Sequence, residues 1–176
     1  GIGTAIIDKG VMTIKSKGEK KGLSAVLSAT TGTAVKAGEN TFFETHCYAP
    51  IDMMKPFEIQ AKVNIKQLAE DRLVGLVFNY RDGGNFYAFS FNDDFVKFTR
   101  YEDNMIVGDI MQGIKWPGKR RSDMDWLLIS DGQTLIFKID GVSILTIRHM
   151  PLQYSGFGFY TFGNQELVVD EVEFRQ

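Results

Sequence analysis

Residues 73–101 read LVGLVFNYRDGGNFYAFSFNDDFVKFTRY, three aromatic-rich runs that are separated by the short polar turns RDGGN and NDD. In the first run the apolar side chains Val74, Leu76 and Phe78 alternate along the chain. A period of two places alternate side chains on one face of a strand, and Gly, Asn and Asp favour the tight turns that reverse the chain. This stretch therefore predicts an antiparallel β-meander.

The same pattern continues on both sides of the meander. Residues 57–65 alternate between apolar and polar, and LIFKIDGVSILTI (135–147) reads as a hairpin whose Asp140-Gly141 pair suits a two-residue primed turn. Further strands are predicted at 11–14, 23–27, 41–48, 126–130, 156–162 and 167–174, and the only predicted helix is a short one at 65–72. So many strands need two packed sheets or a closed barrel. We expect an all-β, two-sheet antiparallel sandwich that forms one domain over residues 1–176.

Composition and charge narrow the classes of partner. The 20 basic and 22 acidic residues leave a formal charge of −2, so we expect no nucleic-acid partner. No apolar run approaches the ~20 residues of a membrane helix, and the first residues lack the regions of a signal peptide. We therefore expect no membrane insertion.

Cys47 is the only cysteine, which excludes an internal disulfide and a cysteine zinc cluster. A small buried hydrophobe is the first interpretation of this residue. His46 is its neighbour in sequence, but neighbours on a strand point to opposite faces, so the two do not form a hydrogen-bonded pair.

The segments FEIQAKV, GLVFNYRDGGNFYAFSF, FVKFTRY, WLLIS, DGQTLIFKIDG and GFGFYTFGNQELVVDEVEF, in this order, resemble the concanavalin A-like lectin/glucanase jelly rolls. Within that superfamily the sequence looks most like laminin-G-type and related bacterial domains. The resemblance covers about residues 57–174. It implies two curved sheets, a ligand at the concave face or along one rim, and a periplasmic or extracellular location. Members of the superfamily bind sugars, cleave glycosides or bind proteins.

The alternative that the protein is a glycoside-cleaving enzyme can be tested by looking for the acids that such enzymes need. Retaining glucanases of this fold carry acids at alternate positions of one strand, close enough for a nucleophile and an acid/base to cooperate. The nearest match is VVDEVEF, where Glu171 and Glu173 share a face but are preceded on it by Val169, while Asp170 points the other way. The three-acid pattern is absent, so we favour a role without catalysis.

Aromatic side chains are the first candidates for ligand binding, because sugar rings stack on Trp and Tyr. Trp116 lies in the basic loop IKWPGKRRSD, where it either stacks on a ligand or folds its own loop against the sandwich; Trp126 opens an apolar strand and is expected in the core. Three tyrosines and an arginine of the meander, and one arginine of the basic loop, complete the candidate site: Tyr80, Tyr87, Tyr101, Arg100 and Arg120. Alternation does not decide which face of the meander is the groove.

Calcium is a candidate ligand, because Asn92-Asp93-Asp94 and Glu102-Asp103-Asn104 are oxygen-rich turns. Asn and Asp also favour turns on backbone grounds alone, and no other cofactor is predicted. Three hypotheses follow. The first is a non-catalytic, lectin-like module that binds an oligo- or polysaccharide, and the alternatives are a sugar-processing enzyme and a domain that binds a protein partner.

Overall fold

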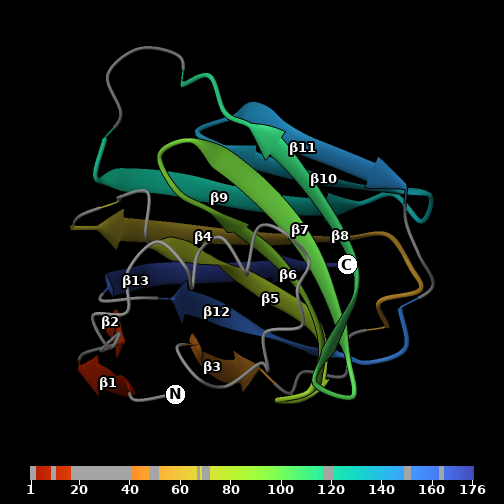
Figure 1. The fold of residues 1–176 in the computed structure, drawn as a ribbon, viewed down its shortest axis with the longest axis horizontal. Helices are drawn as coiled ribbons and strands as arrows, with labels where there is room; N and C mark the ends of the chain where they lie inside the picture. The colour runs from red at the N-terminus through yellow and green to blue at the C-terminus, as the bar shows by residue number, and fades with distance from the viewer. Residues whose placement is uncertain are drawn as a thin grey trace.

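A computed structural model of the chain describes residues 3–8, 11–16, 41–47, 52–66, 68, 72–116, 121–148, 152–162 and 165–176. These residues form thirteen strands and no helix, arranged in two antiparallel sheets (Figure 1). The prediction of an all-β, two-sheet sandwich is confirmed.

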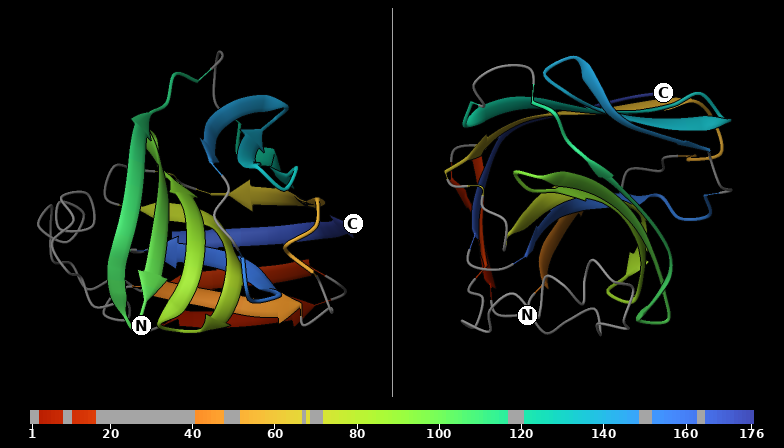
Figure 2. Two further views of the ribbon diagram at one scale, coloured as in Figure 1. Left: turned by 90° about the vertical axis from the view of Figure 1, so that its right-hand side faces the viewer. Right: turned by 45° about the horizontal axis from the view of Figure 1, so that its top comes forward.

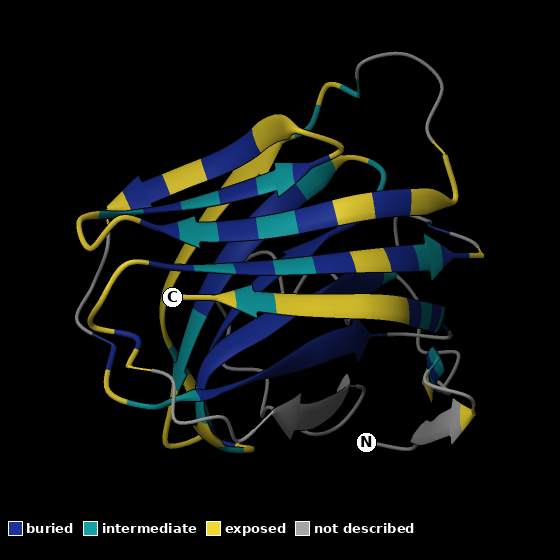
Figure 3. Ribbon diagram, turned by 180° about the vertical axis from the view of Figure 1, so that it is seen from behind, coloured by how far each residue is buried: buried dark blue, intermediate teal, exposed yellow. Residues whose placement is uncertain are grey.

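The first sheet has seven strands and contains the first and the last of the described strands. Its order is β1 (Gly3–Asp8), β2 (Val11–Ser16), β13 (Gln165–Arg175), β4 (Phe57–Ile65), β9 (Asp123–Ser130), β10 (Thr134–Ile139) and β11 (Val142–Arg148). In β4 the apolar side chains from Phe57 to Ile65 point inward and the polar ones between them point to solvent. Figure 3 shows these alternating bands along the strands. The sheet thus has one core face and one wet face.

The second sheet has six strands and carries the predicted meander. Its order is β3 (Thr41–Cys47), β12 (Gly156–Phe162), β5 (Leu73–Asp82), β6 (Asn85–Phe91), β7 (Phe95–Glu102) and β8 (Met105–Gly113). The sheet is strongly bent (Figure 2). Strand β6 is buried on both faces, which agrees with its place inside the sheet.

Aromatic rings fill the space between the two sheets. Trp126 of β9 meets Phe91 of β6 edge to face at 5.3 Å between centroids, and Phe137 of β10 stacks on Phe89 of β6 at 5.2 Å. Edge-to-face and offset pairs of this kind stabilise beyond the area that they bury. The predicted core position of Trp126 is confirmed, since its side chain is almost fully buried.

A second apolar cluster lies on the other face of the six-stranded sheet, away from the seven-stranded one. We call it the outer-face cluster; its members, all buried, are Leu73, Val77, Phe86, Ala88, Tyr160 and Phe162. Tyr87, Phe89 and Phe91 belong to the core between the sheets. The face of β6 that packs in the core is therefore the one that carries these three rings.

The predicted turns are present. Asp140 and Gly141 have φ angles of 49° and 78°, as a primed two-residue turn requires. Asp103 and Asn104, with φ angles of 49° and 65°, make the same kind of turn between β7 and β8.

Several predicted elements differ from the observed ones. Strands β1 and β8 were not predicted, and Ile65, expected to open a helix, is the last residue of β4. Half of that helix, residues 67 and 69–71, and the strand expected at 23–27 lie outside the described residues. The side chains of His46 and Cys47 also lie outside the description, which covers only their backbone in β3.

Glu171 and Glu173 of β13 share a face, as predicted, but the prediction that Val169 precedes them on that face is wrong. A register shift between Val169 and Glu171 breaks the alternation, so Val169 is buried while Glu171 and Glu173 lie opposite Lys62 and Gln60 on the wet face. A bulge inserts one extra residue and so exchanges the faces beyond it.

No helix long and apolar enough to cross a bilayer occurs among the residues that the structure describes.

Candidate functional site

A polar cleft of about 340 Å³ opens at the end of the six-stranded sheet where the β5–β6 and β7–β8 turns lie side by side. We call it the turn-end cleft. It is lined by two strand ends, two turns and the segment before β12: Asn79, Arg81, Asn85, Phe86, Tyr87, Tyr101, Glu102, Asp103, Gln153 and Tyr154. The lining combines hydrogen-bonding groups with aromatic rings, as sites for small polar ligands do.

Asn79 holds one wall of the turn-end cleft in place. Its side-chain oxygen accepts hydrogen bonds from the backbone N–H groups of Gln153 and Tyr154, both at 2.8 Å. Its φ angle of 47° lies in the left-handed region, which Asn adopts more readily than most residues. Tyr154 is therefore fixed beside the end of β5.

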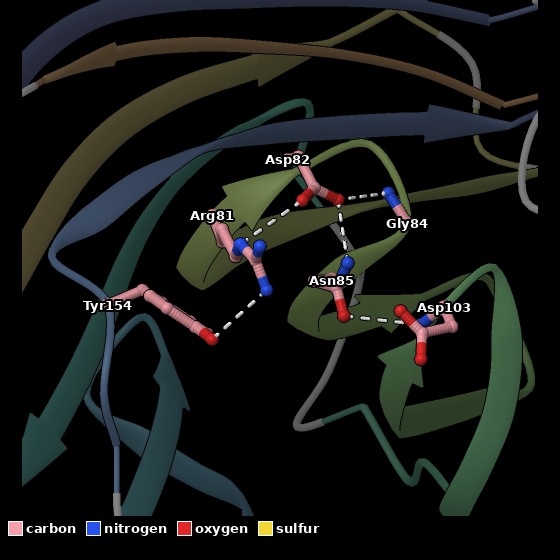
Figure 4. Close-up of polar contacts among 6 residues, drawn as sticks. All are labelled: Arg81, Asp82, Gly84, Asn85, Asp103 and Tyr154. Atoms are coloured by element: carbon pink, nitrogen blue, oxygen red, sulfur yellow. Dashed lines mark hydrogen bonds and ion pairs between the residues drawn. The ribbon is translucent and has the colours of Figure 1, made fainter.

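Arg81 lies between Tyr154 and Asp82 and contacts both (Figure 4). Its guanidinium carbon is 5.6 Å from the centre of the Tyr154 ring, and its Nη1 is 3.5 Å from the Tyr154 hydroxyl. Its Nε lies 3.5 Å from a carboxylate oxygen of Asp82. A guanidinium has five N–H donors, and within the described part of the chain these contacts use only two of them.

Asp82 anchors the β5–β6 turn. Its Oδ1 accepts hydrogen bonds from the Asn85 amide at 2.8 Å and from the backbone N–H of Gly84 at 2.9 Å. These bonds favour the ionised form and hold the pKa of Asp82 below its ordinary value. Asn85 in turn accepts a hydrogen bond from the backbone N–H of Asp103 at 3.2 Å, which joins the two turns.

Two of the predicted tyrosines line the cleft, and both are largely enclosed. Burial raises the pKa of Tyr101 well above its usual range, and the neighbouring Tyr160 hydroxyl acts in the same direction. The Tyr101 ring stacks on Phe86 at 4.4 Å. Burial also raises the pKa of Tyr87, whose ring packs edge to face on Phe78 and Phe98. The Tyr101 hydroxyl is engaged by Tyr160, and the Tyr87 hydroxyl by Arg100.

The other predicted site residues lie elsewhere. Arg100 stands beside the cleft, with its Nε 3.2 Å from Glu102, and Tyr80 packs on the outer-face cluster 6.4 Å from the Phe86 ring. Trp116 lies near the β6–β7 turn at the opposite end of these strands, where its indole N–H donates to the Asp93 carbonyl at 2.8 Å. Its ring packs against the core near Phe91. These contacts suit a tryptophan that folds its own loop, the second of the two interpretations.

Arg120 lies outside the described residues. The structure thus brings Tyr87, Tyr101 and Arg100 together and separates them from Trp116. The ligand contacts of all these residues stay predictions.

The turns proposed for calcium have internal roles. The side-chain oxygen of Asn92 accepts hydrogen bonds from the backbone N–H groups of Asp94 and Phe95, at 2.9 and 3.0 Å. Both acceptor positions of that oxygen are therefore used within the turn. Among the described residues, no group of three or more His, Cys, Asp or Glu side chains is placed to hold a metal ion.

A larger groove, of about 560 Å³, crosses the wet face of the seven-stranded sheet. Its lining contains Lys62, Asn64, Asp123 and Asp125, and no aromatic side chain is among the residues that form it. Asn64 and Asp123 are hydrogen-bonded to each other at 2.6 Å. Without a ring to stack on a ligand, this groove is the weaker candidate for sugar binding.

Sequence reasoning missed most of the polar lining. Five residues of the lining were not among the predicted site residues: Asn79, Arg81, Asn85, Gln153 and Tyr154. The turn RDGGN was the one available signal, because Arg, Asp and Asn beside a reversing glycine pair place three polar groups at one sheet end.

Comparison with known proteins identifies the fold. No protein-family model and no curated protein sequence matches the chain. Among solved structures, the carbohydrate-binding module CBM66 from Bacillus subtilis is similar over 99% of this chain and 92% of its own, with a TM-score of 0.62 and 13% identity. A legume lectin-like domain from Entamoeba histolytica gives a TM-score of 0.63 at 13% identity, over 99% of this chain and 87% of its own. The chain has the concanavalin A-like jelly-roll fold.

Sheep galectin-11, in complex with glycerol, is similar to 77% of this chain and covers 98% of its own, with a TM-score of 0.56 and 13% identity. The resemblance stated from the sequence is therefore confirmed for the fold. In this concanavalin A-like sandwich the outer-face cluster buries apolar side chains on the sheet face where the resemblance places a ligand groove. The turn-end cleft is a polar site at the rim, formed by described residues of this sheet and of the segment before β12.

Proposed function

We propose that the protein is a non-catalytic, lectin-like module that binds an oligo- or polysaccharide in the turn-end cleft. The observation that carries this proposal is the placement of Arg81. Its guanidinium is held against the Tyr154 ring and beside Asp82, while further N–H donors remain for ligand hydroxyls.

The chemistry of the lining fits a sugar. Sugar hydroxyls both donate and accept hydrogen bonds, and the cleft offers donors from Arg81 and Asn85 and acceptors from Glu102 and Asp103. Tyr154 supplies an aromatic surface at the same wall. The similar structures, which include a carbohydrate-binding module and a lectin-like domain, support the same class of ligand.

Binding is favoured over glycoside cleavage because the three-acid pattern is absent from the sequence, and Asp82, beside the cleft, is not suited to be a general acid. A general acid in a glycosidase needs a carboxyl whose pKa is raised, so that it carries a proton at neutral pH. The pKa of Asp82 is lowered instead, mainly by the Asn85 amide. This carboxylate therefore acts as a fixed hydrogen-bond acceptor.

A module that binds polysaccharides meets its ligand outside the cytoplasm. We accordingly propose a periplasmic or extracellular location in a bacterial cell. This part of the proposal rests on the resemblance and on the class of ligand.

The experiment is a thermal-shift and calorimetric screen against neutral and acidic oligosaccharides, with added calcium in one arm and a chelator in the other. A ligand present at ~100 times its dissociation constant stabilises the fold by about 2.7 kcal/mol. The Arg81→Ala and Tyr154→Ala variants are each expected to weaken binding by at least about tenfold, which corresponds to about 1.4 kcal/mol.

Arg175→Ala is the matched control. Its side chain is 62% exposed, against 58% for Arg81, and it makes ion pairs on the wet face of the other sheet. Equal loss of binding in Arg175→Ala, or no binding of any sugar, would overturn the proposal. Loss in Trp116→Ala with full binding in Arg81→Ala would move the site to the opposite end of the strands. Loss of binding in the chelator arm alone would assign a metal to the site.

A further inference from the structure

Carboxylates outnumber guanidiniums around the turn-end cleft. Arg81 lies 3.5 Å from Asp82, and Arg100 lies 3.2 Å from Glu102, so each of these cations has an acidic neighbour. Asp103, which also lines the cleft, makes no ion pair within the part of the chain that the structure describes. A ligand that enters the cleft therefore meets a surplus of negative charge.

The backbone that carries the Asp103 carboxylate is fixed beside the cleft. The backbone N–H of Asp103 donates to the side-chain oxygen of Asn85 at 3.2 Å (Figure 4), and the backbone N–H of Asn104 donates to the Gly84 carbonyl at 3.0 Å. These two bonds join the β7–β8 turn to the β5–β6 turn. The acidic residue thus has its place at the cleft before a ligand arrives.

We propose that the turn-end cleft selects neutral sugars over acidic ones, and that Asp103 is the residue that makes this selection. The inference rests on the proposed function, because it names the class of sugar that the same cleft binds. An ionised carboxylate accepts hydrogen bonds from neighbouring hydroxyls of a neutral sugar, and such charge-assisted bonds are stronger than neutral ones. The carboxylate of a uronic acid has no proton to donate and is repelled.

Arg81 does not reverse this preference. A guanidinium alone would attract an acidic sugar, but Asp82 lies beside it and offsets its charge. Hydrogen bonds from the Asn85 amide and from the backbone N–H of Gly84 favour the ionised form of Asp82. An acidic ligand would therefore bring a further negative charge to a site that already carries Asp82 and Asp103.

The test is calorimetry with sugars that differ only in charge. The probes are β-1,4-linked glucose and mannose oligosaccharides, and any other neutral oligosaccharide that binds in the screen. Each is compared with its C6-oxidised form, which carries a carboxylate, and with the methyl ester of that form, which does not. In 0.01 M salt the acidic form is expected to bind at least about tenfold more weakly than its neutral parent, and the ester is expected to recover most of the affinity.

Salt gives a second readout of the same repulsion. The screening length falls from about 30 Å in 0.01 M salt to about 3 Å in 1 M salt. The difference between the neutral and the acidic sugar is therefore expected to shrink in 1 M salt, while the affinity for the neutral sugar changes little.

Asp103→Asn removes the charge and suits the left-handed backbone at this position, where φ is 49°. In this variant the difference between the neutral and the acidic sugar is expected to fall to about threefold or less in 0.01 M salt. Asp170→Asn is the matched control, because it removes one negative charge from an exposed position of β13 in the other sheet. It is expected to discriminate as the wild type does.

Three results would overturn the inference and leave the sugar-binding module standing. They are an acidic form that binds as tightly as its neutral parent, a methyl ester that binds as weakly as the acid, and an Asp103→Asn variant that discriminates like the wild type. If neither neutral nor acidic sugars bound, the proposed function itself would fail, and this inference with it.

Discussion

Asn79 joins two parts of the chain that lie far apart in sequence. It combines a left-handed backbone with a side-chain oxygen that accepts two backbone N–H groups, from Gln153 and Tyr154. Asn79→Ala removes the one oxygen that accepts both hydrogen bonds, and it leaves alanine in a left-handed backbone region that Asn adopts more readily. The free energy of unfolding is expected to fall by about 2–3 kcal/mol in urea denaturation.

Two other substitutions of Asn79 separate these effects. Asn79→Asp keeps the acceptor oxygen and tolerates the backbone, so it is expected to stay within about 1 kcal/mol of the wild type. Asn79→Gly suits the backbone but lacks the acceptor oxygen. Its free energy of unfolding is expected to lie between those of the Asn79→Asp and Asn79→Ala variants. If Asn79→Gly were as stable as the wild type, the two hydrogen bonds would contribute nothing to stability.

Single residues explain why the candidate site could be predicted only in part. Alternation along the meander pointed to Tyr87 and Tyr101, which do line the cleft. The contact of Arg81 with Tyr154 spans 73 positions of sequence, and no local pattern signals it. Trp116 attracted attention because it stands among loop residues, whereas its indole N–H is used by the Asp93 carbonyl.

Gly75 of β5 shows how closely neighbouring strands approach. A Cβ at this position would lie 1.9 Å from the Phe89 carbonyl oxygen and 2.6 Å from the Ser90 Cα, both backbone atoms of β6. Gly75→Ala therefore forces the two strands apart, and a loss of at least about 2 kcal/mol in the free energy of unfolding is expected. Chemical denaturation measures it.

Gly108→Ala is the matched control, because it changes a strand glycine of the same sheet where the new methyl group meets nothing within 4 Å. Its stability is expected to be unchanged or raised by up to about 1 kcal/mol, since Ala restricts the unfolded chain. Equal losses in the two variants would show that the close contact at Gly75 is not the cause.

Among the strands, the pattern of burial decides which ones can be predicted from the sequence. Strand β4 is buried on one face, so its composition alternates and it was predicted with its observed ends. Strand β8 is exposed on both faces, mixes Met, Ile and Val with Gly and Asp, and left no alternation to detect. The bulge in β13 is likewise invisible in composition, because the extra residue shifts the faces without a change of residue type.

The two sheets are held together by one aromatic layer, and this has a consequence for the whole molecule. Phe137 is fully buried and touches Phe89 and Phe91 of the opposite sheet as well as Trp126 of its own. Phe137→Ala is expected to lower the free energy of unfolding by about 3–5 kcal/mol. Tryptophan fluorescence and far-ultraviolet circular dichroism are expected to report one coincident transition, since both sheets lose the shared layer.

Phe137→Leu, which keeps most of the buried volume, is expected to lose clearly less stability. Two separate transitions in Phe137→Ala would show instead that the sheets unfold independently.

The fold as a whole was predictable because many strands each show the alternating pattern that indicates a β-sandwich. Ten or more alternating segments with turn residues between them leave few architectures, and the order of the motifs indicated a jelly roll. What composition could not supply was the placement of the outer-face cluster, since both faces of β6 are apolar. The outer face of β6 is identified only by its packing with side chains of β12 and β5, which belong to the same cluster.

The position of β13 has a consequence for how the chain folds during its synthesis. This strand is made after every other described strand, yet it lies inside the seven-stranded sheet, between β2 and β4. Until residues 165–176 leave the ribosome, β2 and β4 cannot be joined through it, and the apolar face of β4 is only partly supported. Pairings between distant segments form slowly and leave unpaired strands exposed to aggregation. The nascent chain would therefore be most vulnerable to aggregation just before β13 emerges, when a chaperone would protect it best.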